Sequence, residues 1–322
     1  MKPRALIVGD RRKPGVEEGV QSALPFLRSR LDISGVDLDD RLDLSKERAD
    51  FVLVFGGDGS FLYVANRLGT NPIPVLGVNF GRLGWLAELQ PDGLEEGIDA
   101  YVGGRFQVTE RARLRCTHRL GTRVVDEGLA FNDVVVGRRA LGRMIEVDVR
   151  IDGQGAITVA GDGLIVATAS GSTAHALAAG GPLVAPSLPA VVLAPICPHA
   201  LGTRPLVLPQ SSRIEIVVRG DRAGAAVTVD GREPRALERG ETIEVSDAHA
   251  PLRVVSVSGR SYYDLLRAKL GWKGRLEYAI DARDGAARSS PPPVLAAPEP
   301  EIPEADAPAP PRRRVPKGPP RA

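Results

Sequence analysis

Apolar positions in the first hundred residues form short continuous runs separated by stretches with helical spacing. Three runs have the length of buried strands, at 4–9 (RALIVG), 51–55 (FVLVF) and 73–79 (IPVLGVN). Two stretches between and after them predict helices, at 16–31 and 60–68. Pro25 interrupts the first of these, and proline ends or kinks helices. Strands alternating with helices predict an α/β domain with a Rossmann-like parallel sheet, whose ligands gather beyond the carboxyl ends of the strands.

After about Gly104 the pattern changes to short strand-like runs with turns between them, which continue as far as Val257. This spacing predicts a β-rich, sandwich-like domain. A helical piece, SYYDLLRAKLGW, follows at 261–272. We therefore expect four parts, at 1–104 (α/β), 105–258 (β-rich), 259–282 (helical, returning to the first domain) and 283–322 (a disordered tail).

The tail prediction depends on composition. From Ser289 onward the chain holds 12 of its 27 prolines, together with alanine and scattered charge. Such a segment cannot bury enough apolar surface to become ordered. The tail also carries a basic cluster at 312–314, with Lys317 and Arg321 nearby. The alternative to a solvated tail is therefore that these basic residues contact an anionic partner.

Composition and charge exclude several broad classes of protein. The 322 residues are 43% hydrophobic and 25% charged, which is typical of a globular protein with room for two domains. A net charge of +2 favours neither a nucleic-acid nor a membrane partner. Cys116 and Cys197 fit no disulfide or zinc pattern, and no signal peptide or membrane-length apolar segment is visible. We expect a cytoplasmic protein.

An acidic residue stands inside a glycine turn directly after the 51–55 run, in the order Gly56-Gly57-Asp58-Gly59-Ser60. Glycines allow a tight turn and leave backbone N–H groups open to a phosphate. A carboxylate would repel that phosphate unless a metal ion lies between them or the carboxylate accepts a proton from the group being phosphorylated. Capping of the next helix is the structural alternative. Two common phosphate-binding signatures are absent: the chain has no G-x-x-x-x-G-K-[ST] motif, and its Gly-Asp-Gly stretches do not continue into G-x-G-x-x-G.

A second polar constellation follows the apolar run LIVAT, where Ser170-Gly171-Ser172-Thr173 offers hydroxyl and backbone N–H groups. These groups suit phosphates or ribose hydroxyls. Asn132-Asp133 lies between two apolar runs, where a polar pair is costly unless it is hydrogen-bonded. Asp230-Gly231 ends a strand-like run and indicates a hairpin turn.

Together these segments resemble the NAD kinase family. The resemblance is carried, in one collinear order, by GGDGS (56–60), NFGRLGWLAEL (79–89), FNDVVV (131–136), RMIEVDV (143–149), GDGLIVATASGSTAHALAAGGP (161–182), APICPHALGTRPLVLP (194–209), VDGR (229–232) and SYYDLLRAKLGW (261–272). It covers roughly residues 1–280.

The resemblance implies an α/β domain and a β-rich domain with NAD bound between them, usually in a homo-oligomer. It also implies transfer of the terminal phosphoryl group of ATP, with a divalent metal such as Mg²⁺, to the 2′-hydroxyl of the adenosine ribose of NAD, which yields NADP. Inorganic polyphosphate as donor and NADH as acceptor stay open. No protein metal ligand is predicted.

The resemblance also implies roles for individual residues. Asp58 would accept the hydroxyl proton, a task that an ionised aspartate can perform at neutral pH. Gly56, Gly57 and Gly59 would let the phosphates approach the backbone, and Asp58 and Gly59 would touch the NAD ribose. Further substrate positions are Phe80, Asn132, Asp133, Arg143, Ala160, Asp162, Ser170, Thr173, Ala174, His175, Ala176, Leu177, Ala178 and Arg232.

Some positions depart from the family pattern. Ser60 stands where threonine is usual, Asp133 where glutamate is usual, and His175 where a pocket tyrosine is usual. A proline usual before the second turn is absent from Ala167-Thr168-Ala169-Ser170. Two other functions stay open, namely a lipid or sphingoid-base kinase with a GGDG-type turn and a non-catalytic NAD- or NADP-binding regulator.

Overall fold

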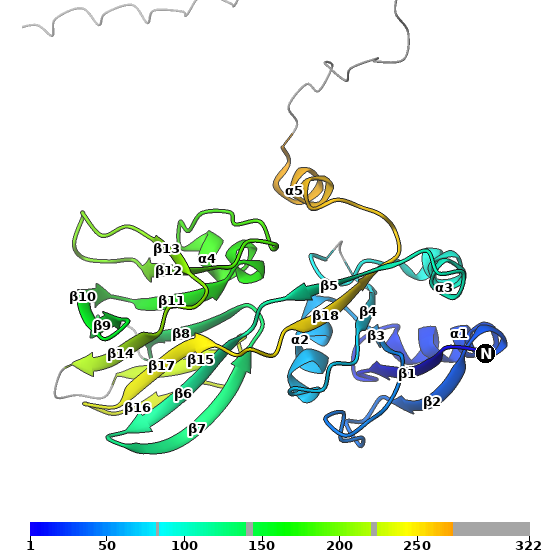
Figure 1. Cartoon of the computed structure of the whole chain (residues 1–322), viewed down its shortest axis with the longest axis horizontal. Helices are drawn as coiled ribbons and strands as arrows, with labels where there is room; N and C mark the ends of the chain where they lie inside the picture. Colours follow the sequence, from blue (N-terminus) through cyan, green and yellow to red (C-terminus); the bar gives the residue numbers. More distant parts are fainter. Residues whose placement is uncertain (82–83, 140–143, 220–223, 273–322) are drawn as a thin grey trace, which may run out of the picture. The chain divides into compact units, whose positions relative to one another are not determined.

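The first sheet has six strands in the order β2-β1-β3-β4-β18-β5 (Figure 1). The computed structural model describes residues 1–81, 84–139, 144–219 and 224–272. The strands are β1 (Arg4–Gly9), β2 (Asp32–Asp37), β3 (Phe51–Phe55), β4 (Val75–Val78), β5 (Gln107–Arg111) and β18 (Leu252–Ser256). Neighbouring strands from β2 to β18 pair in parallel, and β5 pairs antiparallel with β18.

Helices cover both faces of this sheet because its strands are apolar on both sides. Helices α1 (Val16–Arg30) and α3 (Leu94–Val102) pack with Ala5 and Ile7 on one face. Helix α2 (Asp58–Arg67) packs with Leu6 and Val8 on the other. Since successive strand residues point to opposite faces, such continuous apolar runs belong to a parallel sheet buried on both sides.

Two further six-stranded sheets pack face to face, in the orders β10-β9-β14-β17-β6-β7 and β13-β12-β11-β8-β15-β16. Their strands are β6 (Leu114–Leu120), β7 (Arg123–Ala130), β8 (Asp133–Arg138), β9 (Ile145–Ile151), β10 (Gln154–Gly161), β11 (Gly163–Thr168), β12 (Ala190–Ile196), β13 (Leu206–Pro209), β14 (Ile214–Arg219), β15 (Ala225–Val229), β16 (Arg235–Leu237) and β17 (Thr242–Asp247). One apolar core fills the space between them.

The second polar constellation covers the outer face of the third sheet. A 3₁₀ turn, η2 (Ser170–Thr173), leads into the single-turn helix α4 (His175–Ala178). Ala169 and Ala176 from this segment pack against Val135 of β8 and Ile165 of β11. Small residues are needed here because the segment lies directly on the sheet.

Side chains also join α2 to the β-rich region. The Phe61 ring packs edge-on against Phe131, with ring centroids 6.4 Å apart. The buried Arg113 guanidinium donates hydrogen bonds to the carbonyl oxygens of Ala250 and Gly69, at 2.6 and 2.7 Å, and burial lowers its pKa. A cation close to the C-terminal end of α2 also complements the helix dipole.

The expected fold class, an α/β region followed by a β-rich region, is confirmed. Helix α1 continues through Pro25, and α2 begins two residues before its expected start. Strand β2 was not expected, because DISGVD has no apolar run and buries only Asp37. Helix α3 was not expected either. Residues 157–168, one of the strand-like runs after Gly104 in the sequence, belong to two strands, β10 and β11, which lie in different sheets.

Residues on both sides of the expected domain boundaries join the first sheet. Strands β5 and β18 belong to this sheet, although 105–258 was expected to be the β-rich domain. Helix α5 (Tyr262–Leu270) follows β18 and begins with a reciprocal capping box between Ser261 and Asp264. The expected disordered tail, 283–322, lies outside the described residues.

Nowhere in the described ranges is a helix both apolar enough and long enough to cross a membrane.

Candidate active site

The GGDGS turn connects the buried strand β3 to α2. Gly56 has a φ of 150°, and a side chain there would overlap the Ser60 hydroxyl. Gly57 is the N-cap, so Asp58 is the first residue of the helix. Only glycine satisfies both requirements at position 56, because L-residues rarely adopt this backbone conformation. The turn thereby places the Asp58 side chain just beyond the end of a parallel strand.

The Asp58 carboxylate binds backbone N–H groups of the loop that follows β4. It accepts hydrogen bonds from Trp85, Leu86 and Ala87, at 2.6, 3.0 and 3.2 Å. A Cβ atom on Gly84 would overlap the Asp58 Oδ1 atom. The carboxylate is therefore fixed by the backbone of the NFGRLGWLAEL segment rather than by a charged side chain.

Lys13, in the loop after β1, contacts the same turn from a different element. Its Nζ atom donates a hydrogen bond of 2.7 Å to the buried Ser60 hydroxyl. A cavity of about 250 Å³, which we call the Lys13 cavity, is lined by Gly9, Asp10, Arg12, Lys13, Gly59, Ser60 and Tyr63 with Val8 and Val64. Arg12 donates to the Asp10 carboxylate through Nε at 2.8 Å, which lowers the pKa of that carboxyl group.

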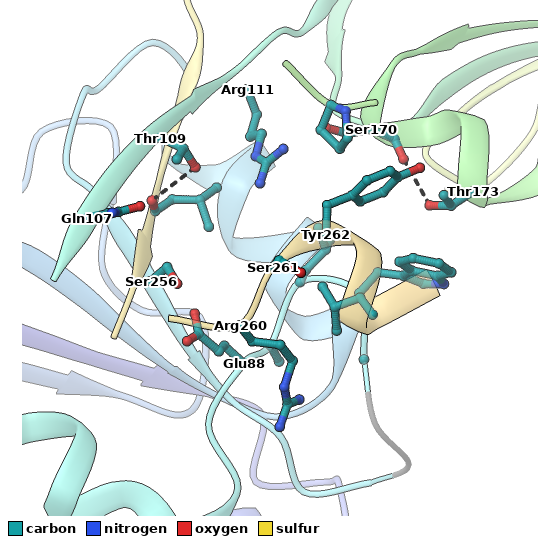
Figure 2. Close-up of a pocket in the computed structure, with 17 residues that line it drawn as sticks. Glu88, Gln107, Thr109, Arg111, Ser170, Thr173, Ser256, Arg260, Ser261 and Tyr262 are labelled. Carbon is teal, nitrogen blue, oxygen red and sulfur yellow. Dashed lines mark hydrogen bonds between the residues drawn. The ribbon is translucent and has the colours of Figure 1, made fainter. Parts of the chain in front are cut away.

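A second cavity, of about 300 Å³, lies beside the loop that holds Asp58 (Figure 2). We call it the Tyr262 cavity; its lining includes Trp85, Leu86, Arg111, Ser170, Thr173 and Tyr262. Figure 2 shows the Tyr262 ring, from the first turn of α5, directed toward Ser170 and Thr173. Arg111 is half-buried, and this burial lowers its pKa. The Tyr262 cavity thus joins the loop around Asp58 to the second polar constellation.

The FND segment is held by Asp230. The Asp230 carboxylate accepts hydrogen bonds from the backbone N–H groups of Phe131, Asn132 and Asp133, at 2.8, 2.7 and 3.1 Å. Asp230 itself has a φ of 49°, in the left-handed region that non-glycine residues rarely adopt. It also accepts a 3.3 Å hydrogen bond from the Asn66 side chain on α2. Asp230 therefore connects α2, the start of β8 and the β15–β16 hairpin.

The Asp133 carboxyl group is buried in this arrangement, with 5% of the residue exposed. Burial, together with the negative charge of Asp230, raises its pKa to about 7. The polar pair that the sequence placed between apolar runs is thus stabilised through its backbone. The Asp133 carboxyl group itself remains in a low-dielectric environment, which disfavours its charged form.

The turn at 170–173 packs directly on the FND segment. The Thr168 hydroxyl donates to the carbonyl oxygen of Phe131 at 2.7 Å and accepts the Gly171 N–H at 2.9 Å. A Cβ atom on Gly171 would overlap the Asn132 carbonyl oxygen, so glycine is required for this close approach. Ser172 is fully buried and bonds Val184, so its hydroxyl is structural.

The remaining predicted residues lie in several places. Asp162 and His175 line a third cavity of about 530 Å³, where Asp162 pairs with Arg138 at 3.1 Å. Arg232 lines a fourth, of about 510 Å³, and donates to the Asn66 side chain at 2.7 Å. The structure therefore brings Asp58 close to the Tyr262 cavity but distributes the other predicted positions over more than one cavity.

Seven predicted positions have other settings. The Phe80 ring packs in the core of the α/β region, 5.7 Å from the Phe55 ring. Ala176 is fully buried against the third sheet, whereas Ala178 is exposed. The Ala160 carbonyl oxygen accepts the His199 N–H. Arg143 lies outside the described residues. Ala174 and Leu177 are half-buried in the segment that carries His175.

Sequence reasoning missed Lys13, Asp230 as a hydrogen-bond acceptor, and the wall formed by Trp85 and Tyr262. Lys13 is 47 positions from Ser60, and Asp230 is 97 to 99 positions from the N–H groups that it accepts. The available signals were three consecutive basic residues after the first strand, at 11–13, and an aspartate followed by glycine, at 230–231. Neither signal identifies its distant partner.

The chain is similar to known proteins in both its α/β and its β-rich regions. Family models of the ATP-NAD kinase N-terminal and C-terminal domains match residues 17–106 and 131–257. The NAD kinase of Thiobacillus denitrificans is 37% identical over 284 residues, which cover 84% of this chain and 97% of that protein. The NAD kinase of Pseudomonas putida strain W619 is 43% identical, covering 71% of this chain and 78% of that one.

The chain belongs to the NAD kinase family.

Solved structures of this family have the same fold. Yeast NADH kinase, complexed with NADH, superposes with a TM-score of 0.76 at 23% identity, over 90% of each chain. An NAD kinase from Archaeoglobus fulgidus in complex with ATP gives a TM-score of 0.67 at 29% identity, over 83% of this chain and 97% of that one. As a member of the NAD kinase family, the chain is a phosphotransferase.

Proposed function

We propose that the chain transfers the terminal phosphoryl group of ATP to the 2′-hydroxyl of the adenosine ribose of NAD, giving NADP and ADP. The observation that carries this proposal is the Asp58 carboxylate, held by three backbone N–H groups beside the Tyr262 cavity. Family membership supports the reaction. Relatives and solved structures named as NAD or NADH kinases support the choice of a dinucleotide over a lipid as the acceptor.

Asp58 accepts the hydroxyl proton as the acceptor oxygen attacks the γ-phosphorus. The new oxygen–phosphorus bond forms as the bond to the β-phosphate oxygen breaks, and ADP leaves with that electron pair. The hydrogen bonds from Trp85, Leu86 and Ala87 orient the carboxylate and keep it from rotating. In phosphoryl transfer the protein takes little part in the covalent chemistry. Positioning of this kind therefore supplies much of the increase in reaction rate.

In this proposal NAD, the phosphoryl acceptor, contacts the β-rich region. Ser170 and Thr173 offer polar groups to the Tyr262 cavity, and Asn132 directly precedes β8, which begins at Asp133. Gly56, Gly57 and Gly59 allow the phosphates to approach the turn. Asp162, His175 and Arg232 lie on cavities farther along the β-rich region and would contact the rest of the dinucleotide.

Magnesium would arrive bound to the donor phosphates. In the described parts of the chain no group of three or more His, Cys, Asp or Glu side chains is arranged to hold a metal ion. Mg²⁺ is commonly held by one or two carboxylates together with substrate phosphates, and Asp10 and Asp58 are the carboxylates beside the turn. When bound, the ion neutralises charge on the transferring group.

We also propose that the chain works as a homo-oligomer in the cytoplasm. Apolar side chains are exposed on the hairpin of β6 and β7, at Leu120, Val124 and Val125. Exposed apolar side chains grouped on an edge hairpin are typical of surfaces that pair with another copy. Light scattering of the purified chain, compared with a Val125→Asp variant, tests this assembly; a monomeric wild type would contradict it.

The activity is tested by incubating the purified chain with ATP, Mg²⁺ and NAD and detecting NADP with an NADP-specific dehydrogenase. Parallel reactions with NADH, and with a diacylglycerol or sphingosine in place of NAD, define the acceptor. We expect NADP to form and the lipids to remain unphosphorylated. Absence of NADP, or phosphorylation of a lipid in its place, would refute the proposal.

A further inference from the structure

We propose that the Lys13 cavity binds the phosphate chain of the donor, with the Lys13 ammonium as its principal contact. This inference rests on the proposed function, because it assigns a place to a substrate of that reaction. The phosphate chain must reach the GGDGS turn to meet an acceptor hydroxyl beside Asp58. Gly59 and Ser60 of that turn line the Lys13 cavity, whereas the loop that binds Asp58 lines the Tyr262 cavity.

Lys13 is fixed at the turn and still has donors to offer. Its backbone N–H bonds the Asp10 carbonyl oxygen at 3.0 Å, which closes the loop after β1, and its Nζ atom bonds the Ser60 hydroxyl at 2.7 Å. Within the described part of the chain, the ammonium is in no ion pair. An ammonium has three N–H donors, so two remain for phosphate oxygens. A lysine ammonium acts on phosphate as a compact point charge.

The neighbouring carboxylate does not neutralise this site. Asp10 is bonded by both the backbone N–H and the Nε atom of Arg12, at 3.0 and 2.8 Å. The Lys13 charge also contributes to lowering the Asp10 pKa, although the Arg12 hydrogen bond is the largest cause. The cavity therefore carries one net positive charge from Asp10, Arg12 and Lys13 together. The N-terminus of the ten-residue helix α2 adds a partial positive charge on the same side.

The size of the cavity indicates which part of the donor it recognises. A volume of about 250 Å³ is below the roughly 300–1,000 Å³ of pockets that enclose drug-sized ligands. The cavity therefore takes phosphate groups and leaves the base of a nucleotide outside. We infer that the site recognises a triphosphate chain, from either a nucleoside triphosphate or an inorganic polyphosphate.

The Tyr262 cavity is the rival location for the donor, because Arg111 also places a cation beside the loop that holds Asp58. It is lined, however, by Ser170 and Thr173, the polar groups expected on the acceptor side. The second cation in its lining, Arg260, is exposed, whereas Lys13 bonds Ser60 of the GGDGS turn itself. The two cavities have different linings, one with Gly59 and Ser60 of the turn and one with the loop that binds Asp58, so donor and acceptor can each have a separate cavity beside Asp58.

The kinetic test compares Lys13→Met with Lys13→Arg and with the control Lys46→Met. Lys46 is an exposed lysine paired with Asp43 and lines neither cavity, so its replacement removes the same charge from another loop. We expect Lys13→Met to raise the KM for ATP by about tenfold to a hundredfold, as expected when a hydrogen bond to a charged group is lost. The KM for NAD should stay within about twofold, Lys13→Arg should recover part of the effect, and Lys46→Met should match wild type.

A binding test separates this inference from the reaction itself. Calorimetry with inorganic tripolyphosphate needs no turnover, so the site can be tested even if no NADP forms. Wild type should bind tripolyphosphate, which should also compete with ATP, and Lys13→Met should lose at least tenfold in affinity. Tripolyphosphate is also tested as the sole phosphoryl donor. NADP formation would show that inorganic polyphosphate can serve as the donor, whereas inhibition without NADP formation would show that the donor must be a nucleoside triphosphate. Unchanged tripolyphosphate binding in Lys13→Met, or an equal rise in the KM for NAD and ATP, would overturn the assignment.

Discussion

The carboxylate of Asp58 accepts the backbone N–H of Trp85 over 2.6 Å, which joins the first turn of α2 to the loop after β4. The two residues follow adjacent parallel strands, Asp58 at the start of α2 after β3 and Trp85 in the loop after β4. The same loop forms a wall of the Tyr262 cavity. The orientation of the proposed proton acceptor therefore depends on the backbone of a loop that also contacts the acceptor cavity.

Replacement of Gly84 by alanine tests this dependence. The added Cβ atom would overlap the Asp58 Oδ1 atom, so either the carboxylate or the loop must move. A displacement of about 1 Å can cost on the order of 10²-fold in rate. We therefore expect Gly84→Ala to lower the initial rate of NADP formation by about that factor, with an unchanged circular dichroism spectrum.

The matched control is Gly93→Ala, in the short 3₁₀ turn before α3. A Cβ atom there meets no other atom within 4 Å, and Gly93 has an ordinary negative φ of −95°. Its rate should equal that of wild type. If Gly84→Ala also retained the wild-type rate, the loop would not position Asp58.

Asp230→Gly removes the carboxylate that holds the FND segment without adding backbone strain, because glycine tolerates a φ of 49°. The N–H groups of Phe131, Asn132 and Asp133 would lose their acceptor. Each unsatisfied buried group costs about 1–3 kcal/mol. We expect the free energy of unfolding to fall by roughly 2–5 kcal/mol, measured by urea denaturation.

Asp152→Gly provides the comparison for that variant. Asp152 also has a left-handed backbone, with a φ of 53°, but among the described residues its carboxylate accepts only the Arg213 N–H, in an exposed turn. Its loss should change the free energy of unfolding by less than about 1 kcal/mol. Equal losses in the two variants would mean that the three hydrogen bonds to Asp230 contribute little.

Because of Asp133, the free energy of unfolding should decrease as pH rises, which is unusual for an aspartate. Burial and the charge of Asp230 raise its pKa from 3.8 to about 7 in the folded chain. Between these values the folded state holds a proton that the unfolded state lacks, so stability falls as pH rises from about 4 to about 7. The loss is at most about 4 kcal/mol, at roughly 1.4 kcal/mol per pKa unit.

The measurement is urea unfolding of wild type and Asp133→Asn at several pH values between 4 and 8. Asparagine cannot ionise, so the difference between the two proteins isolates this group. We expect the wild type to lose stability relative to the variant as pH rises across this interval. A difference that is constant with pH would show that Asp133 titrates at its ordinary pKa.

The hydrophobic pattern predicted β1, β3 and β4 because each is apolar on both faces, as a strand between two helical layers must be. It could not predict β2, an edge strand whose only buried residue is Asp37. Nor could it assign β18 to the first sheet. An apolar run does not indicate which of two neighbouring sheets it will join.

The same distinction applies to the candidate site. Glycines around Asp58 predicted a turn after a buried strand, because glycine adopts backbone conformations that other residues rarely adopt. The contacts that fix the carboxylate come from backbone N–H groups of residues 85–87, and every residue except proline carries such a group. Tertiary contacts of this kind, like that between Lys13 and Ser60, leave no signature in either segment alone.

The most direct test of the proposed reaction is the initial rate of NADP formation by wild type and Asp58→Asn at saturating ATP, Mg²⁺ and NAD. Asparagine keeps one oxygen, which can still accept the N–H groups of Leu86 and Ala87, but it is a poor proton acceptor. With circular dichroism and NAD binding unchanged, the rate should fall by about 10²–10⁴-fold, the usual contribution of a positioned acid–base group. A rate within about threefold of wild type would contradict the role of Asp58, since it falls far short of that range.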